Sequence, residues 1–234
     1  MKSLSKWLSF RLTVDRLLGV IFAVLTSPIV AVLALLVRRH DGESPLITVP
    51  RVGVNGTTFQ MWKIRSMRVD TADGHASGVS LTSTNDSRIT PIGARMRSLH
   101  LDELPQLYNV ARGEMCLLGP RPEAPAFVDL QDPVWQTVLS APPGIAGPTQ
   151  LIVGDWERSE IDKDQIGDAY QHVVVPVKLA IDQWYLLNAS WRLDLLILSS
   201  LLRHVLPGGE SARLQEAVAA AVPESAVPIR SQSL

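Results

Sequence analysis

Hydrophobic residues are distributed unevenly along the chain, and the longest apolar run lies close to the N-terminus. Residues 17–37 read LLGVIFAVLTSPIVAVLALLV and contain no charged side chain. A run of this length can cross a bilayer as a helix. It is longer than the apolar region of a signal peptide and ends in Arg38 and Arg39 without a small-residue cleavage site. We therefore expect a membrane segment that stays attached to the protein.

Ser27 and Pro28 lie in the middle of this run. Proline removes one backbone N–H group, and its ring opposes the carbonyl of the preceding turn. Basic residues flank both ends of the run, whereas a simple span has its excess of Lys and Arg on one side. Hydropathy alone would also fit a single spanning helix. The proline and the flanking charges favour a re-entrant, monotopic helix–break–helix hairpin that breaks at Ser27 and Pro28, with both ends on the cytoplasmic side.

The rest of the chain has shorter patterns. Residues 44–67 alternate apolar and polar side chains around Asn55-Gly56, which predicts a β-hairpin. Apolar residues at helical spacing predict two short helices that meet near Asp102, and two amphipathic helices within 173–206, separated near 188–190. Residues 115–122 read as a buried strand or extended segment that ends in a proline-rich turn.

These patterns predict an α+β fold that is mostly helical, with a small β-hairpin and the N-terminal membrane hairpin. We expect a membrane hairpin over 1–40 and a cytoplasmic catalytic domain with membrane-interface helices over 41–206. Residues 68–87 are polar and aperiodic, which predicts a mobile loop. Residues 207–234 are rich in Ala, Ser, Pro and Glu, which predicts a disordered tail.

Composition supports a membrane surface as a partner. The chain has 234 residues, of which 19% are charged and 46% hydrophobic, and a net charge of −1. Residues 1–39 nevertheless carry six Lys or Arg and one Asp. A basic, apolar head on a mildly acidic body fits an anionic membrane and argues against nucleic acid as a partner. Cys116 is the single cysteine and cannot form an internal disulfide, which favours a reducing, cytoplasmic side.

The adjacent carboxylates Asp102 and Glu103 are the first candidates for chemistry. Pro105 suits the first turn of a helix, so Asp102 is a candidate N-cap, and capping alone would account for many such pairs. A helix N-terminus also favours an ionised carboxylate, which makes Asp102 a candidate metal ligand or nucleophile and leaves acid–base work to Glu103. Arginines gather near this pair and suit phosphate binding: Arg95, Arg97, Arg112 and Arg121. The residues alone indicate phosphate chemistry at a bilayer surface.

Several motifs carry a resemblance to a known family. They are RLTVDRLLGV, FQMWKIRSM, LDELPQLYNV with LLGPRPE, PPGIAGPTQ, and VPVKLAIDQWYLLNASWRLDLLIL. The chain thereby resembles the bacterial sugar transferases of the small monotopic phosphoglycosyl transferase family. Such enzymes move a sugar 1-phosphate from a nucleotide diphosphate sugar, here expected to be a UDP-sugar, to polyprenyl phosphate, expected to be undecaprenyl phosphate.

The resemblance implies roles for the matching residues. Asp102 matches the nucleophile, which attacks the β-phosphate of the donor, expels UMP and forms a phosphosugar ester. Glu103 matches the second member of the carboxylate dyad, and Mg²⁺ is expected as a cofactor with Asp102 as its ligand. The residues implied to hold phosphate are Lys63, Arg65, Arg97 and Arg121. The resemblance also implies the bacterial inner membrane, a catalytic domain on its cytoplasmic face, the first membrane step of a surface glycan or exopolysaccharide pathway, and glycan-assembly enzymes as candidate partners.

The chain departs from the family pattern at three positions. Ile64 replaces a usual Phe, and Asp155 stands where many members have an arginine that helps to hold the nucleotide, which leaves the donor base open. His100 replaces a small Ser or Thr before the dyad. We expect His100 to pack or to form ordinary hydrogen bonds, and a tuning role toward the dyad is the alternative.

Two other functions compete with the transferase. One is an inactive membrane scaffold of the same fold, for which the missing arginine at Asp155 leaves room and against which the intact dyad counts. The other is a membrane-anchored, metal-dependent phosphatase. A phosphatase would release free phosphate without a lipid acceptor, whereas the transferase would release UMP and leave a lipid-linked product.

Overall fold

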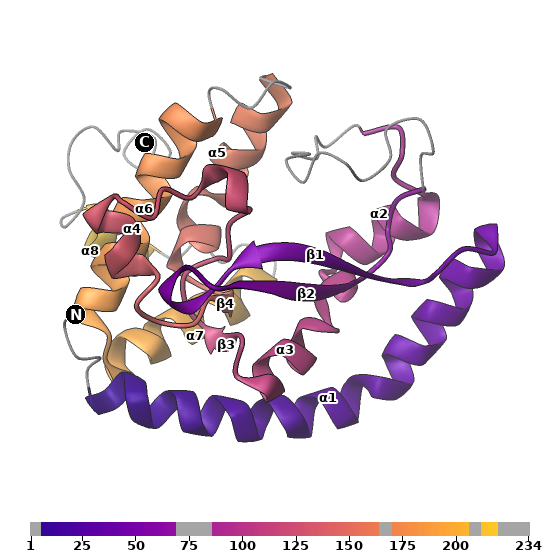
Figure 1. The fold of residues 1–234 in the computed structure, drawn as a ribbon, viewed down its shortest axis with the longest axis horizontal. Coiled ribbons are helices and arrows are strands. Elements are labelled where there is room, and N and C mark those ends of the chain that lie inside the picture. Colours follow the sequence, from indigo (N-terminus) through magenta and orange to yellow (C-terminus); the bar gives the residue numbers. More distant parts are fainter. Residues whose placement is uncertain (1–5, 69–85, 164–169, 206–211, 220–234) are drawn as a thin grey trace.

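The structure, a computed structural model, describes residues 6–68, 86–163, 170–205 and 212–219 (Figure 1). Helix α1 (Lys6–Asp41) runs along one side of the molecule, with the strands and the other helices on its inner side. The sheets are small, with two strands each in the described part of the chain. The prediction of a mostly helical α+β fold with a small hairpin is therefore confirmed.

Helix α1 is continuous through Pro28, so the predicted break at Ser27 and Pro28 is wrong as a statement about secondary structure. Proline at position 28 cannot donate a hydrogen bond to the carbonyl of Val24. The hydroxyl of Ser27 donates to that oxygen instead, at 2.7 Å. The carbonyl thus keeps a partner, and the helix curves rather than ends (Figure 1). The re-entrant, monotopic path stays a prediction.

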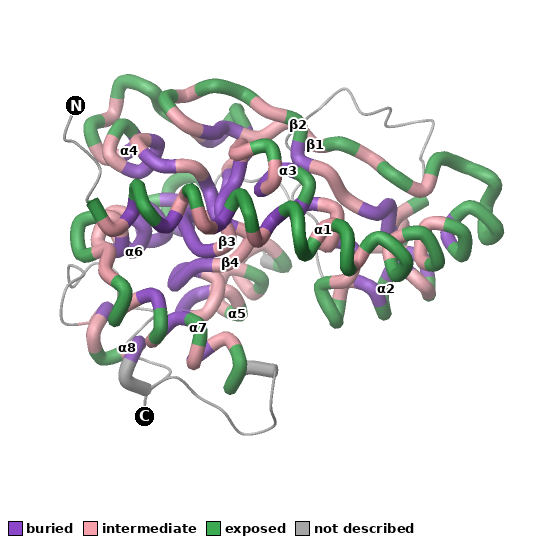
Figure 2. Tube along the Cα trace, turned by 90° about the horizontal axis from the view of Figure 1, so that it is seen from below, coloured by how far each residue is buried: buried purple, intermediate pink, exposed green. Residues whose placement is uncertain are grey.

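One narrow strip of α1 packs on the rest of the protein. Its buried residues include Leu8, Arg11, Asp15 and Gly19, which are three or four residues apart and share one face. The remainder of the helix faces outward (Figure 2). Helix α1 is long and apolar enough to cross a membrane, and only 6% of the residues in its most apolar stretch are buried against the protein. Its exposed apolar side chains include Leu17, Val20, Ile21, Val24, Leu25, Ile29, Val32, Leu35 and Leu36.

A buried polar cluster attaches the N-terminal part of α1 to the body of the protein. Arg11 donates to the carboxylate of Asp194 at 3.0 Å and to the carbonyl of Leu118 at 2.6 Å. It also contacts the hydroxyl of Tyr185, which donates to Asp194 at 2.8 Å. Arg11 therefore belongs to the interior, although the sequence counts it among the basic residues of the N-terminal head.

The predicted hairpin is confirmed. Strands β1 (Leu46–Val52) and β2 (Thr58–Ile64) pair antiparallel, and the turn between them holds Asn55 and Gly56 at positive φ, 54° and 79°. Ile47, Val49 and Arg51 lie opposite Lys63, Met61 and Phe59. Residues directly opposite each other point to the same face, so these six side chains share one face of the hairpin.

Helix α3 (Gln106–Arg112) lies between the hairpin and α1 (Figure 1). A Cβ atom on Gly19 would come within 2.8 Å of the backbone nitrogen of Ala111, so glycine allows α1 and α3 to cross closely. Helix α2 (Pro91–Ser98) begins at Thr90, whose side chain accepts a hydrogen bond from the amide of Gly93. Strand β3 (Cys116–Leu118) confirms the predicted extended segment and pairs in parallel with β4 (Gly144–Ala146).

The second half of the chain is helical. It contains α4 (Pro133–Val138), α5 (Pro148–Lys163), a π-helical turn (Tyr170–Val174), α6 (Val175–Asn188), α7 (Trp191–Val205) and α8 (Ala212–Ala219). Helices α6 and α7 confirm the two predicted amphipathic helices. The expected disordered tail is helical over 212–219, because Leu214 and Val218 lie four residues apart and are fully buried in the cluster that α5 and α7 also line. Most of the expected mobile loop at 68–87 lies outside the described residues.

Candidate functional site

The carboxylate dyad lies in a single 3₁₀ turn, Leu101–Glu103, between α2 and α3. The chain enters this turn through His100, which has a left-handed backbone with φ 53°. This conformation is uncommon for residues other than glycine, but histidine is among those that adopt it more often. It reverses the chain, and Asp102 is buried with 4% of its surface exposed. Histidine at position 100 is exposed and thus acts mainly through its backbone.

Asp102 does not cap a helix, in contrast to the expectation from the sequence. Helix α3 starts at Gln106 and is preceded by Pro105, which does lie at its N-terminus as expected. Glu103, Leu104 and Pro105 lie between Asp102 and the start of that helix. The electrostatic environment of Asp102 is therefore set by neighbouring side chains rather than by a helix end.

Two cations from distant parts of the chain meet at the dyad. Lys63 on β2 places its Nζ 3.2 Å from Oε1 of Glu103 and 3.8 Å from Oδ2 of Asp102. Arg121, in the turn after β3, donates from Nη2 to the same Oε1 of Glu103 at 3.0 Å. Burial would raise the pKa of Glu103, but the charges and hydrogen bonds of Arg121 and Lys63 outweigh burial and lower it. Glu103 is thus held ionised between two cations.

The structure does not bring all of the expected phosphate-binding residues to the dyad. Arg65 donates through all three guanidinium nitrogens elsewhere, to the carboxylate of Asp41 at 2.5 and 2.6 Å and to the carbonyls of Ser44 and Met67. Arg65 thereby ties the end of α1 to the end of β2. Arg97 lies half-buried in the last turn of α2, where its charge acts on Asp86.

A second cluster of charged residues adjoins the dyad and was not predicted. We call it the Lys178 cluster; its members are Glu123, Glu157, Tyr170 and Lys178. Nζ of Lys178 contacts Glu123, donates to Glu157 at 2.7 Å and reaches the Tyr170 hydroxyl at 2.8 Å. The Tyr170 hydroxyl also lies 3.1 Å from Glu157 and 3.2 Å from Glu123.

Arg121 links the dyad to the Lys178 cluster. The attraction of Glu103 raises the pKa of Arg121, and Glu157 and Glu123 add to this effect. One signal for this arrangement was present in the sequence, because Glu123 follows Arg121 in GPRPE. Glu157 and Lys178 come from α5 and α6 and reach the site only through the fold.

The position expected to carry a nucleotide-binding arginine does not enter the site. Asp155 on α5 has 78% of its side chain exposed and pairs with Arg158, one turn further along, at 3.3 Å. Glu157, two residues later, is the α5 residue that reaches the buried cluster. The substitution at position 155 therefore changes the outer surface of α5.

The residues present fit a magnesium ion to a limited extent. Among the described residues, no group of three or more His, Cys, Asp or Glu side chains could hold a metal ion. Mg²⁺ commonly uses one or two protein carboxylates and completes its shell with water and substrate phosphates. Because Glu103 is engaged by two cations, Asp102 is the dyad carboxylate that is available for such a role.

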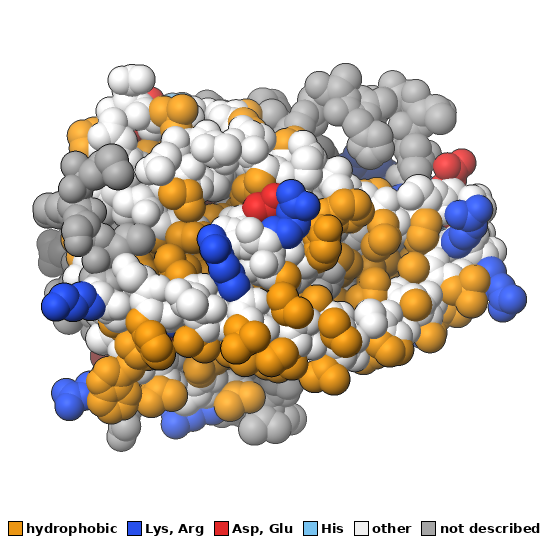
Figure 3. Space-filling view, turned by 60° about the horizontal axis from the view of Figure 1, so that its bottom comes forward, with side chains coloured by type: hydrophobic (Ala, Val, Ile, Leu, Met, Phe, Trp, Pro, Cys, Tyr) orange, Lys and Arg blue, Asp and Glu red, His pale blue; other side chains and the backbone are white. Residues whose placement is uncertain are grey.

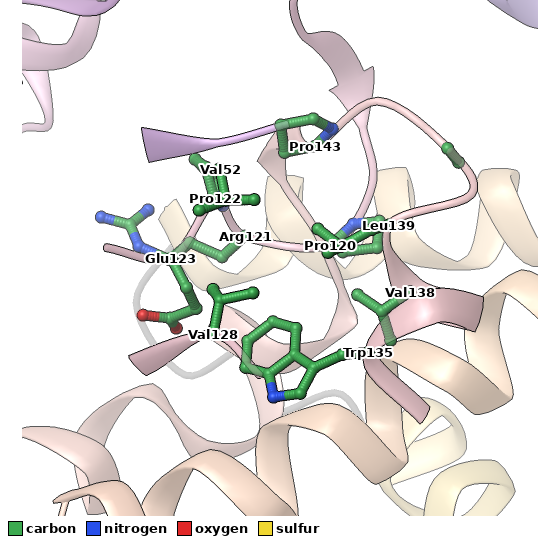
Figure 4. A pocket seen from close by; sticks show the side chains of 11 residues that line it. Val52, Pro120, Arg121, Pro122, Glu123, Val128, Trp135, Val138, Leu139 and Pro143 are labelled. Atoms are coloured by element: carbon green, nitrogen blue, oxygen red, sulfur yellow. The ribbon is translucent and has the colours of Figure 1, made fainter. Parts of the chain in front are cut away.

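An apolar hollow lies behind the Arg121 turn (Figure 4). It is lined by Val52, Trp135, Val138 and Leu139, together with the prolines of the turn. The charged ends of Arg121 and Glu123 point away from these apolar side chains (Figure 4). The apolar side chains around the hollow therefore lie against the back of the turn. The candidate functional groups, Arg121 and Glu123, extend from its opposite, polar face.

The surface places charge beside apolar side chains. Figure 3 shows a broad band of hydrophobic side chains along the side where α1 runs, with basic and acidic side chains directly beside it. Helix α7 adds exposed Trp191, Leu195, Leu198 and Leu202. The guanidinium of Arg192 lies 5.3 Å from the centre of the Trp191 ring, an arrangement suited to an interface.

Asp182 gives a testable link between pH and stability. It is buried on α6 and accepts a hydrogen bond from Thr149. Burial raises its pKa from 3.8 to about 7, against the opposing effects of Thr149 and Lys178. Between these two values the unfolded chain loses the proton first, so the wild-type free energy of unfolding falls as pH rises, by up to about 1.4 kcal/mol per pH unit from this group.

We expect Asp182→Asn to remove this slope. The free energy of unfolding of the variant, relative to that of wild type, should therefore be higher at pH 8 than at pH 5. Chemical denaturation at both values measures the difference. An equal difference at the two pH values would contradict an uncharged Asp182 in the folded protein.

Comparison with known proteins supports one family. The model of the bacterial sugar transferase family matches residues 6–208. The chain is 33% identical over 197 residues to UDP-N-acetylgalactosamine-undecaprenyl-phosphate N-acetylgalactosaminephosphotransferase of Aeromonas hydrophila. The matched region covers 83% of this chain and 43% of that relative. It is 34% identical over 159 residues to UDP-glucose:undecaprenyl-phosphate glucose-1-phosphate transferase of Caulobacter vibrioides, covering 65% of this chain and 58% of the relative.

A third relative is matched over most of its own length. The exopolysaccharide production protein ExoY of Sinorhizobium fredii is 29% identical over 195 residues, covering 78% of this chain and 79% of that protein. The chain therefore spans less than half of the Aeromonas relative but most of the Sinorhizobium one.

Proposed function

Because the chain belongs to the bacterial sugar transferase family, we propose that it transfers a sugar 1-phosphate from a nucleotide diphosphate sugar to polyprenyl phosphate. The names of three relatives, from Aeromonas hydrophila, Komagataeibacter xylinus and Caulobacter vibrioides, include undecaprenyl phosphate, and two of these names include a UDP-sugar. A UDP-sugar and undecaprenyl phosphate are accordingly the substrates that we propose for this chain. The product would be a polyprenyl diphosphate sugar, with UMP released.

The contrast between the two carboxylates carries this proposal. Glu103 Oε1 lies within 3.2 Å of two cations, whereas Asp102 Oδ2 lies 3.8 Å from Lys63, beyond hydrogen-bond distance. A carboxylate near a cation but not bound by it retains an oxygen for attack on phosphorus. Glu103 is suited to hold Lys63 and Arg121 in place. Its acid–base role stays a prediction, because the two cations favour its ionised form.

The proposed reaction has two displacements. An oxygen of Asp102 attacks the β-phosphorus of the donor, the bond from that phosphorus to the bridging oxygen breaks, and UMP leaves with the electron pair. A phosphate oxygen of the polyprenyl phosphate then attacks the same phosphorus and releases the Asp102 carboxylate. Lys63 and Arg121 are placed to stabilise the charge that moves onto the phosphoryl oxygens. Mg²⁺ held at Asp102 would neutralise part of the diphosphate charge when bound.

The membrane would hold the lipid acceptor beside this site. Helix α1 presents an apolar face outward and packs its inner strip against the body that carries the dyad. We propose that α1 enters the inner membrane from the cytoplasmic face and that the body rests on that face, with α7 as an interface helix. The first membrane step of a surface glycan pathway fits this arrangement.

The proposed topology makes a direct prediction. Reporter domains fused to the N-terminus and to the C-terminus should both score as cytoplasmic, because a re-entrant segment returns to the side that it entered. A spanning form of α1 would place the two reporters on opposite sides. A periplasmic reporter at either end would therefore overturn the monotopic arrangement.

Release of UMP tests the proposed function. Purified full-length protein in nanodiscs would be given Mg²⁺, undecaprenyl phosphate and each of a panel of UDP-sugars. We expect UMP release that requires the lipid acceptor, and the active donor would identify the sugar. Free phosphate without acceptor would indicate a phosphatase instead. Folded protein that releases neither product across the panel would favour a scaffold.

A further inference from the structure

Arg51 lies on the same side of the hairpin as Lys63. In β1 it stands opposite Phe59, and Lys63 stands opposite Ile47 on that same face. The end of β1 is fixed to the Arg121 turn, because the amide of Val52 donates to the carbonyl of Glu123 at 3.0 Å. The fold thus brings the strand that carries Arg51 directly beside the turn that carries Arg121.

Arg51 differs from the other cations of the site in its contacts. Lys63 and Arg121 pair with Glu103, and Lys178 pairs with Glu123 and Glu157. Within the described part of the chain, the side chain of Arg51 donates a hydrogen bond to the carbonyl of its neighbour Pro50, at 2.9 Å. No carboxylate among the described residues lies within ion-pair distance of Arg51.

The surroundings of Arg51 favour an additional anion. Burial lowers the pKa of Arg51; Glu123 opposes this effect, the like charge of Arg121 adds to it, and Tyr170 and Glu103 also oppose it. A half-buried guanidinium beside a second guanidinium is unfavourable in the free protein. A phosphate group between them would accept hydrogen bonds from both forks and remove the repulsion.

We propose that Arg51 and Arg121 together bind a phosphate group of a substrate, with Arg51 contributing a guanidinium that forms no ion pair with a carboxylate of the described residues. This proposal rests on the proposed function and adds a binding residue to its site. The shared chemistry is a phosphate oxyanion, which either the diphosphate of the donor or the phosphate monoester of the lipid acceptor supplies.

Binding of inorganic pyrophosphate tests this site without any turnover. The full chain in detergent would be titrated by calorimetry as wild type, Arg51→Gln, Arg51→Lys and Arg158→Gln. Arg158→Gln is the matched control, because it makes the same change at an exposed position. We expect Arg51→Gln to bind about tenfold more weakly, the size of one charge-assisted hydrogen bond. The control should bind as wild type does.

The charge-retaining variant keeps the test valid if Arg51→Gln does not fold. Arg51→Lys loses the two-pronged geometry and should bind several-fold more weakly. Unchanged pyrophosphate affinity in folded Arg51→Gln, or in Arg51→Lys where the glutamine variant does not fold, would overturn the proposal.

Steady-state kinetics identify the source of the phosphate. A raised KM for the UDP-sugar in Arg51→Gln assigns Arg51 to the donor, and a raised KM for undecaprenyl phosphate assigns it to the acceptor. Both KM values unchanged would refute the site. If wild type binds pyrophosphate through Arg51 but releases no UMP, the proposed function fails while the phosphate site stands.

Discussion

Asp102→Asn is expected to lower transfer of sugar phosphate by about a thousandfold or more, because an amide cannot replace the carboxylate oxygen as a nucleophile. The change hardly alters side-chain volume, so the fold should be preserved. The measurement is UMP release together with intact mass after incubation with donor alone. Wild type should gain the mass of a phosphosugar, and the variant should not.

Asp155→Asn is the matched control for this experiment. It makes the same substitution at an exposed position on α5 that pairs only with Arg158 among the described contacts. We expect this control to retain wild-type turnover and the covalent adduct. Full activity in Asp102→Asn would remove Asp102 from the role of nucleophile and leave the dyad as a binding element.

Lys178→Met is expected to lower the free energy of unfolding by about 3–5 kcal/mol, because it leaves the partly buried Glu123 and Glu157 without their shared cation. The lysine side chain is 5% exposed, and methionine is an unbranched, uncharged side chain only one atom shorter. The thermal midpoint should fall by on the order of 10 °C. Turnover should also fall, since the two freed carboxylates would compete with Glu103 for Arg121.

Two further variants isolate the cause. Arg158→Met removes the cation of an exposed ion pair and should cost less than about 1 kcal/mol. Lys178→Met combined with Glu157→Gln should recover part of the loss, because one of the unpaired charges is gone. Equal stability of Lys178→Met and Arg158→Met would show that the Lys178 cluster does not stabilise the fold.

The features that could be predicted from the sequence were those that depend on neighbouring residues along the chain. Asn55-Gly56 favours the positive φ values of a tight turn, so the hairpin was predictable. The apolar residues of α6 and α7 recur at helical spacing, so these two helices were predictable as well. The side chain of Ser27, by contrast, compensates for Pro28 through a hydrogen bond that periodicity does not reveal, and the helix continued where a break was expected.

Contacts between distant segments were harder to predict. The motif resemblance grouped Arg65 with Lys63 as a phosphate-binding residue. In the structure, Arg65 instead binds the carboxylate of Asp41 at the end of α1. The pairing of Glu157 with Lys178 could not be predicted, because the two residues lie on different helices that only the fold brings together. In the C-terminal tail, Leu214 and Val218 are two large apolar residues in a stretch dominated by alanine, and the surface of α5 and α7 against which they pack could not be predicted from that stretch.

The close crossing at Gly19 has a consequence for the lipid environment. With no side chain between the backbones, α3 lies directly against α1, and α3 begins three residues after Glu103. If α1 lies in the membrane, a bilayer thinner than its apolar length would tilt the helix to relieve hydrophobic mismatch. That tilt would carry the carboxylates with it, so turnover would vary with the acyl-chain length of the surrounding lipids.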